Sequence, residues 1–137
     1  MARALGVGGV FFRSQDPAAL CAWYKKWLGV EAAAPYGAMF QPGDVPAGGL
    51  TVWSPFPHDT SYFGDSGQAF MINLMVDDVR AALAQAREGG AQVIDKIEDH
   101  DYGTFGWFVD PDGNRVELWQ PKGDVPETSS GGSEPGA

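Results

Sequence analysis

The chain has 137 residues, of which 44% are hydrophobic and 20% are charged, the proportions of a single soluble globular domain. Its net charge of −9 disfavours nucleic-acid binding, because neutralising phosphates needs a basic surface, and is typical of a soluble protein or of one that attracts a cationic ligand. No apolar run approaches the ~20 residues of a membrane span, the N-terminus lacks a signal-peptide pattern, and the single Cys21 cannot form an internal disulfide, so we expect a cytoplasmic protein without a membrane partner.

The first predicted elements are a strand and a helix. An apolar run at residues 8–12 predicts the strand. Asp16 is placed to cap the helix, Pro17 fits its first turn and Gly29 fits the position after its last turn. The side chains at helical spacing on its apolar face are Leu20, Tyr24, Trp27 and Leu28.

Short apolar runs predict further strands in the first half, at residues 30–33, 37–41 and 49–54. The segment that follows, residues 55–68, is rich in proline, glycine and aromatic side chains and is too long for a minimal connection. We interpret it as a segment that covers a site or forms an interface.

The second half repeats this order of elements. An apolar run at residues 70–76 predicts a strand, Asp78 corresponds to Asp16 as a helix cap, and Gly89 ends the second helix. The apolar face of this helix carries Val79, Ala82, Leu83 and Ala86, and further strands are predicted at residues 92–98, 103–109 and 114–120. The chain is therefore expected to contain two modules, each with the order βαβββ.

A tight turn at residues 110–114, Asp-Pro-Asp-Gly-Asn, joins the last two strands. Pro111 presets φ, Asp112 can bond its own backbone, and Gly113 supplies a positive φ, so the segment predicts a β-hairpin. One face of the hairpin's second strand is apolar and suits a core beneath a helix. The other face carries a carboxylate between a guanidinium and an indole. These faces hold Val116 with Leu118, and Arg115 with Glu117 and Trp119, respectively.

Residues 122–137 contain one valine and no aromatic side chain, so burial cannot offset the entropy that ordering them would cost. We predict a disordered tail here. The preceding residues 4–121 form one domain, with module one at about residues 5–56 and module two at about residues 69–121.

The chain resembles the vicinal oxygen chelate superfamily, which includes glyoxalase I, bleomycin-resistance proteins and extradiol dioxygenases. The resemblance spans essentially residues 5–121. It implies an α+β fold in which two βαβββ modules form curled mixed sheets around a concave cup, with the helices outside and ligands inside, and it implies a homodimer. The matching motifs are Asp16-Pro17 with Trp23-Tyr24 and Leu28-Gly29, then Val76-Asp77-Asp78, then the hairpin turn with Glu117-Leu118.

The metal enzymes of this superfamily take one ligand, usually His, Gln or Glu, from the first and last strand of each module. The corresponding positions here are Gly9, Thr51, Met71 and Glu117. Glycine has no donor, a thioether and a hydroxyl are poor ligands for these ions, and one carboxylate cannot hold a metal alone. We predict that the protein has no metal and no other cofactor.

Glu117 is the candidate catalytic or ligand-contacting residue. It either accepts a hydrogen bond or charge from a ligand, or acts as a general base, or forms a structural salt bridge with Arg115 or Arg13. Residues 56–68 are expected to help close the site. Strand alternation predicts that the ligand-binding residues beside Glu117 in the cup are Thr51, Trp53, Met71, Asn73, Trp107 and Trp119.

Two functions fit this pattern. The first is a glyoxalase/bleomycin-resistance-like protein that binds a small organic molecule in an aromatic, acidic cup without metal. The alternative is a lyase or isomerase acting on a small oxygenated metabolite, with Glu117 as the base or as a ligand of a metal completed by His58 or His100. A fold analogy by itself does not establish an activity, so both functions stay open at the level of the sequence.

Overall fold

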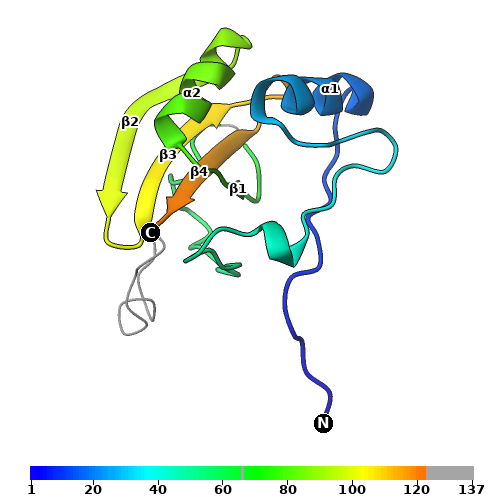
Figure 1. Cartoon of the computed structure of the whole chain (residues 1–137), viewed down its shortest axis with the longest axis vertical. Helices are drawn as coiled ribbons and strands as arrows, with labels where there is room; N and C mark the ends of the chain where they lie inside the picture. Colours follow the sequence, from blue (N-terminus) through cyan, green and yellow to red (C-terminus); the bar gives the residue numbers. More distant parts are fainter. Residues whose placement is uncertain (66, 123–137) are drawn as a thin grey trace.

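The computed structural model describes residues 1–65 and 67–122, so the predicted tail lies outside the described residues apart from Lys122. The α+β class is confirmed: two α-helices and a short 3-10 helix accompany four strands (Figure 1). In chain order the elements are α1 (Pro17–Leu28), η1 (Pro42–Asp44), β1 (Ile72–Met75), α2 (Val79–Glu88), β2 (Gln92–His100), β3 (Gly103–Val109) and β4 (Arg115–Pro121).

The four strands form one mixed sheet with the order β1-β4-β3-β2. Strand β1 is parallel to β4, whereas β4 with β3 and β3 with β2 are antiparallel. The elements β1, α2, β2, β3 and β4 therefore form the second βαβββ module that the sequence predicts. Gly113 has a φ of 85° and its N–H bonds the Asp110 carbonyl at 2.9 Å, as the predicted turn between β3 and β4 requires.

Each face of the sheet carries its own hydrophobic cluster. Helix α2 covers one face, where it packs on the side chains that alternate toward it from β3 and β4, and side chains of α1 pack at the edge of the same cluster. A Cβ on Gly106 would lie 2.7 Å from Leu83 Cδ1, so the glycine lets α2 approach β3 closely. The opposite face carries an aromatic cluster built on Phe105, Trp107 and Trp119.

Helix α1 begins and ends as its sequence predicts, and it is held to the second half of the chain. The Asp16 carboxylate accepts a hydrogen bond from Ala19 N at 3.1 Å, and Gly29 ends the helix with a φ of 67°. Trp23 Nε1 donates to the Gly89 carbonyl at 2.8 Å, which joins α1 to the end of α2.

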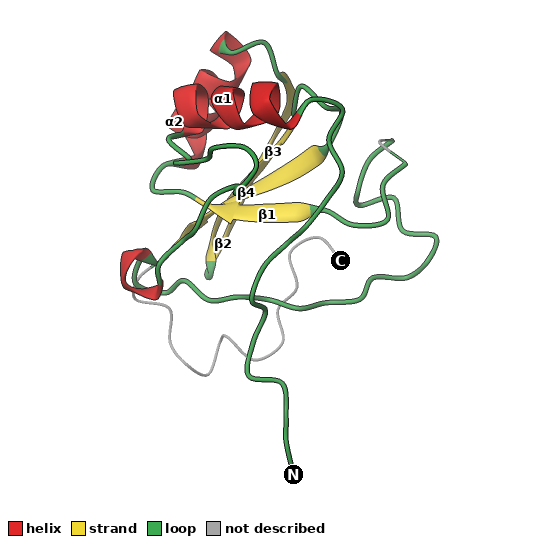
Figure 2. Cartoon of the chain, turned by 90° about the vertical axis from the view of Figure 1, so that its right-hand side faces the viewer, coloured by secondary structure: helices red, strands yellow, loops and turns green. Residues whose placement is uncertain are grey.

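The predicted strands of the first half are not formed. The structure assigns no strand to residues 8–12, 30–33, 37–41 or 49–54, where only an isolated bridge joins Ala33 to Gly37. These segments run as loops (Figure 2). Because a strand needs both a paired neighbour and a surface on which to pack its apolar face, a correct local pattern does not form one without them. The strongly exposed side chains that result include Phe11, Met39, Phe40, Val52 and Trp53.

Within the described ranges, no helix is both long enough and apolar enough to cross a membrane.

Candidate functional site

The carboxylate of Glu117 is the centre of the site. Alternation along β4 directs its side chain away from α2, and it is only 3% exposed. The sheet register places Asn73 of β1 and Trp107 of β3 beside it on either side. Asn73 Nδ2 donates to Oε1 at 2.7 Å, Trp107 Nε1 donates to Oε2 at 3.0 Å, and the Tyr62 hydroxyl also donates to Oε2.

All three of these donors are neutral, so the predicted salt bridge of Glu117 is wrong. Among the described residues, the ion pairs of the structure include neither Glu117 with Arg115 nor Glu117 with Arg13. The guanidinium of Arg115 lies instead over the ring of Trp107, with its central carbon 6.0 Å from the ring centroid. The neighbouring cation thus contacts an aromatic face and not the carboxylate.

Burial dominates the electrostatics of this group. Desolvation raises the pKa of the Glu117 carboxyl, and the hydrogen bonds from Tyr62, Asn73 and Trp107 oppose that rise only in part. Desolvation also raises the pKa of the Tyr62 hydroxyl, and its hydrogen bond to Glu117 raises it further. Tyr62 therefore remains a protonated donor, and the carboxyl holds its proton to a higher pH than a solvated one.

Aromatic side chains surround the carboxylate. Trp107 is 1% exposed, and Trp119 stacks on Phe105 with ring centroids 6.1 Å apart and an interplanar angle of 5°. Trp119 Nε1 donates to the Tyr102 carbonyl at 2.9 Å, so its polar atom is already satisfied within the protein. The aromatic cluster includes Phe105, Trp107 and Trp119, with Tyr62, Met71, Met75, Ile94 and Tyr102 packed against it.

The structure brings most of the predicted site residues together, but not all of them. Met71 and Trp119 lie in the aromatic cluster, and the hydrogen bonds of Asn73 and Trp107 join both residues to Glu117. Thr51 and Trp53 are not among the side chains packed on it: both are exposed, and Trp53 keeps 79% of its surface accessible. They are displaced because the strand predicted to carry them is not formed.

The segment between the two halves reaches Glu117 through Tyr62, a residue that the sequence analysis did not single out. Tyr62 stacks on Phe56 at 5.5 Å and meets the ring of Trp107 edge-on at 6.1 Å. At Gly64 the same segment approaches the sheet, where an added Cβ would lie 2.8 Å from Arg115 Cδ. The sequence did contain a clue to Tyr62, because it is the only tyrosine in residues 55–68. A tyrosine can bury its ring and still donate a hydrogen bond to a buried carboxylate.

A glyoxalase-like domain model matches residues 9–119 of the chain. The chain belongs to the glyoxalase-like domain family. Among solved structures, a glyoxalase / bleomycin resistance protein from Catenulispora acidiphila DSM 44928 is 27% identical, with 78% of this chain and 90% of that chain covered and a TM-score of 0.37. No curated protein matches the chain. The predicted membership of the vicinal oxygen chelate superfamily is confirmed.

The glyoxalase-like domain does not present the donors of a divalent metal at the four inherited positions. Gly9 has no side-chain donor, and Thr51 is exposed away from the aromatic cluster. Met71 packs against that cluster and offers only a thioether, and both oxygens of Glu117 already accept hydrogen bonds. Within residues 1–65 and 67–122, no three His, Cys, Asp or Glu side chains are grouped so as to hold a metal ion, which leaves His58 and His100 outside any such group. These residues do not fit the metal of the superfamily's enzymes.

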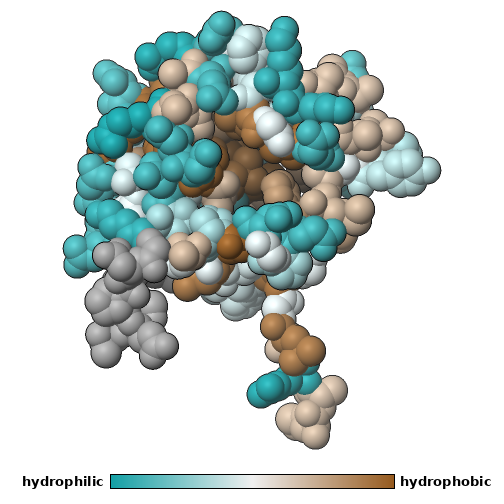
Figure 3. All heavy atoms as spheres, in the orientation of Figure 1, coloured by the Kyte–Doolittle hydropathy of each residue, from teal (hydrophilic) through white to brown (hydrophobic). Residues whose placement is uncertain are grey.

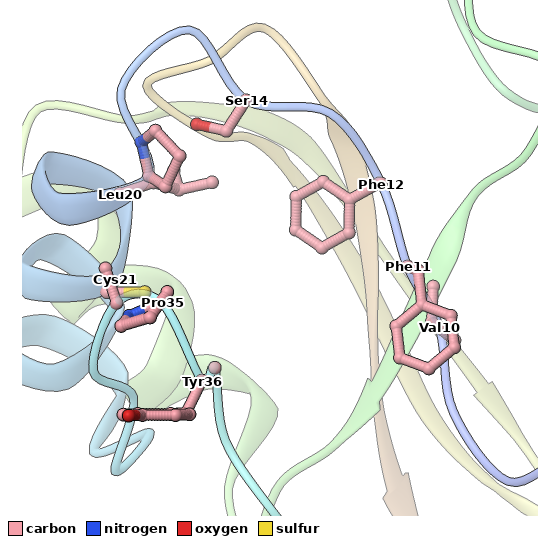
Figure 4. A pocket seen from close by; sticks show the side chains of 11 residues that line it. Val10, Phe11, Phe12, Ser14, Leu20, Cys21, Pro35 and Tyr36 are labelled. Carbon is pink, nitrogen blue, oxygen red and sulfur yellow. The ribbon is translucent and has the colours of Figure 1, made fainter.

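Apart from the Glu117 site, a hollow lies in the first half of the glyoxalase-like domain. It has a volume of about 250 Å³ and lies between the N-terminal segment, α1 and the turn after α1 (Figure 4). On the face of the molecule that Figure 3 shows, hydrophobic side chains gather in a hollow that hydrophilic residues surround. None of the residues that line the cavity is charged, and none belongs to the aromatic cluster; they include Val10, Phe12, Leu20, Cys21, Pro35 and Tyr36.

Proposed function

We propose that this glyoxalase-like domain binds a small organic molecule on the sheet face around Glu117, without a metal. The observation that carries the proposal is a buried carboxylate whose three hydrogen-bond partners are all neutral. Desolvating a carboxylate without a cation costs stability, and titratable groups perturbed in this way concentrate at functional sites. Nothing in the described part of the fold requires the Glu117 carboxylate to be buried, whereas a ligand that forms a hydrogen bond to the carboxylate would account for its burial.

The surroundings of Glu117 support the same function. Asn73, which donates to Oε1, is exposed, so the carboxylate lies directly behind a solvent-facing amide. Trp107 and the rest of the aromatic cluster are buried, and the ring of Tyr62 packs edge-on against Trp107. A flat organic molecule that took the place of the Tyr62 ring would meet the flat apolar face of the tryptophan. Tyr62 approaches from a segment without regular secondary structure, the kind of segment that opens and closes over sites.

The test is a thermal-shift and calorimetric screen of small aromatic metabolites on the wild type and on Glu117→Gln. Glutamine keeps the shape of the side chain, and if the amide of Asn73 reverses, every hydrogen bond can be kept. We expect the glutamine to weaken ligand binding by roughly 5- to 100-fold, since a charge-assisted hydrogen bond is lost. The control is Glu88→Gln, which removes an exposed carboxylate at the end of α2. Equal binding by all three proteins would refute the proposal.

One observation favours a second function. Burial raises the pKa of Glu117, and a raised pKa suits a general base that removes a proton next to a carbonyl. A lyase or isomerase of this glyoxalase-related kind would use the carboxylate itself and not a metal. Its test is exchange of carbon-bound protons of hydroxyacetone in D₂O, followed by NMR: catalysis by the wild type and not by Glu117→Gln supports it, and no acceleration excludes it for this ketone.

The metal prediction has a direct measurement. We expect elemental analysis of the purified protein to find well below one transition-metal ion per chain, because Gly9 and Thr51 replace ligands. About one divalent ion per chain, lost in Glu117→Ala, would contradict it.

We also propose that the protein is a cytoplasmic homodimer. The large exposed hydrophobic side chains of the described residues all lie at positions 1–70, and exposed apolar surface, where it gathers into a patch, marks association sites. Strand β1 forms one edge of the sheet, which is a further surface for pairing. The single Cys21 suits a reducing compartment.

A further inference from the structure

Tyr62 differs from the other two donors to Glu117 in where it comes from. Asn73 belongs to β1 and Trp107 to β3, so the sheet itself holds both donors beside the carboxylate. Tyr62 lies in residues 56–64, which form no helix or strand. The backbone hydrogen bonds of this segment include two local turns, from Thr60 N to the Pro57 carbonyl and from Gly64 N to the Ser61 carbonyl, each at 3.0 Å. These turns fold the segment on itself, and none of its residues belongs to a strand of the sheet.

The aromatic ring of Tyr62 packs against Trp107 above the Glu117 carboxylate. It lies edge-on to Trp107, with an interplanar angle of 87°, while its hydroxyl reaches the carboxylate. The ring is only partly buried, next to the exposed amide of Asn73. The phenol that bonds to the Glu117 carboxylate in this structure thus belongs to the protein itself.

We propose that residues 56–64 are a displaceable cover and that the ligand is a neutral phenol, whose hydroxyl replaces that of Tyr62 on Glu117. This inference rests on the proposed function and deepens it by naming the class of ligand. The chemistry of the site selects that class, because a ligand phenol restores the hydrogen bond that the departing tyrosine breaks and can pack against the same tryptophan. An aryl ether or hydrocarbon would leave the buried carboxylate oxygen short of a donor.

The charges around Trp107 argue against an organic cation as the ligand. Lys96 Nζ lies 5.7 Å and the guanidinium carbon of Arg115 lies 6.0 Å from the centroid of its ring. The ammonium of Lys96 is paired with Glu98 at 2.8 Å, so the guanidinium of Arg115 is the like charge that a cationic ligand would meet at close range, at a cost in affinity. A neutral donor meets no such repulsion and matches the neutral side chains that Glu117 already accepts.

The experiment titrates the full-length protein with 4-methylphenol, the side-chain analogue of tyrosine, and with 4-methylanisole and 4-methylbenzylamine as ether and cation probes. We expect the phenol alone to bind saturably to the wild type. Tyr62→Phe should tighten its binding about fivefold, because the cover then no longer competes for Glu117. Glu117→Gln should weaken it by a similar factor. The control Tyr36→Phe, at a side chain that is 90% exposed, should leave the affinity unchanged.

A second readout detects the movement of the cover without a mutation. Amide hydrogen exchange in residues 56–64 of the wild type should speed up when 4-methylphenol is added, whereas binding beneath an intact cover would slow it. Slower exchange overturns the inference, even if Tyr62→Phe fails to fold.

The outcomes separate this inference from the proposed function. If the ether or the amine binds in a Glu117-dependent way, the ligand class is wrong but the ligand site at Glu117 stands. If Tyr62→Phe does not change the affinity for the phenol while Glu117→Gln does, the displaceable cover is wrong and the site again stands. Phenol binding that is insensitive to both Tyr62→Phe and Glu117→Gln places the ligand elsewhere, for example in the apolar hollow beside α1, and overturns the inference. A failure of every screened compound to bind in a Glu117-dependent way overturns both.

Discussion

At the scale of single residues, two buried carboxylates of this protein have different surroundings. Asp110 accepts hydrogen bonds from the backbone N–H groups of Asp112 and Asn114, both at 2.9 Å, and from the Tyr24 hydroxyl at 2.8 Å. It builds its own turn, so its burial has a local structural reason. In the described part of the chain, the Glu117 carboxylate accepts hydrogen bonds only from side chains, and these come from three different segments. That contrast is why we assign structure to Asp110 and ligand binding to Glu117.

The raised pKa of Glu117 predicts how stability depends on pH. Above the ordinary pKa of 4.5, the unfolded state loses this proton before the folded state does. The free energy of unfolding that Glu117 contributes is therefore full below about pH 4.5 and falls as the pH rises through the raised folded-state pKa. Urea unfolding between pH 4 and pH 8 should show wild type losing stability relative to Glu117→Gln. Parallel curves would mean that the carboxyl titrates normally.

Tyr24 tests the structural assignment of Asp110. Tyr24→Phe removes the hydroxyl that joins α1 to the hairpin turn and leaves a buried carboxylate short of one donor. We expect a loss of about 1–3 kcal/mol in the free energy of unfolding, measured by urea denaturation. Tyr36→Phe is the matched control, because Tyr36 is 90% exposed and should change stability by less than about 0.5 kcal/mol. Similar values for both variants would contradict the role assigned to this bond.

At the scale of elements, the second module is held together by the close approach of α2 to β3. Val79 and Leu83 of α2 pack directly over Gly106, where any side chain would meet them. Asp78 caps the helix through Ala81 N at 3.0 Å, and the Gln120 side chain accepts from Val79 N at 2.9 Å. The start of α2 is thus tied to the sheet both through its cap and through its packing. The site on the opposite face depends on this anchor, since β3 and β4 carry Trp107 and Glu117.

Gly106→Ala should disturb that anchor. Its Cβ would lie 2.7 Å from Leu83 Cδ1 and 2.9 Å from Val79 Cγ1, so the helix must shift outward. We expect about 1–3 kcal/mol of destabilisation by thermal or urea unfolding. Gly43→Ala is the control, because nothing lies within 4 Å of a Cβ added there. If Gly106→Ala is as stable as the control, the packing of α2 on β3 is looser than we infer.

At the scale of the whole molecule, the two halves of the repeat differ. The second half forms a packed module, whereas the first contributes α1, η1 and loops to the described structure. Apolar side chains that alternate as in strands remain exposed in the first half, among them Phe11 at 94% and Trp53 at 79%. Such surface is what the homodimer that we propose would cover.

Light scattering should therefore find a dimer of the 14.6 kDa chain at micromolar concentration. Phe11→Glu should shift the mass toward that of the monomer, because it places a charge at a strongly exposed apolar position. Glu88→Gln, at an exposed polar position, should leave the mass unchanged. A wild-type mass of one chain would contradict the homodimer.

The sequence by itself determined those features whose causes are local. The caps at Asp16 and Asp78 and the positive φ at Gly113 each depend on chemistry within a few residues. The alternation along β4, which sends Glu117 away from the helix, follows from the period of a strand. These patterns were sufficient to predict the second module and the family.

Only the tertiary structure decided what depends on distant partners. Tyr62 meets Glu117 across a separation of 55 residues, and no local pattern specifies that pair. The first-half strands failed for the same reason, because strand formation needs a neighbour that the described chain does not supply there, and Trp53 consequently lies away from the site. Of the roles considered for Glu117, the structural salt bridge is not formed, because the sheet register places Asn73 and Trp107 beside the carboxylate and the arginine lies over the indole.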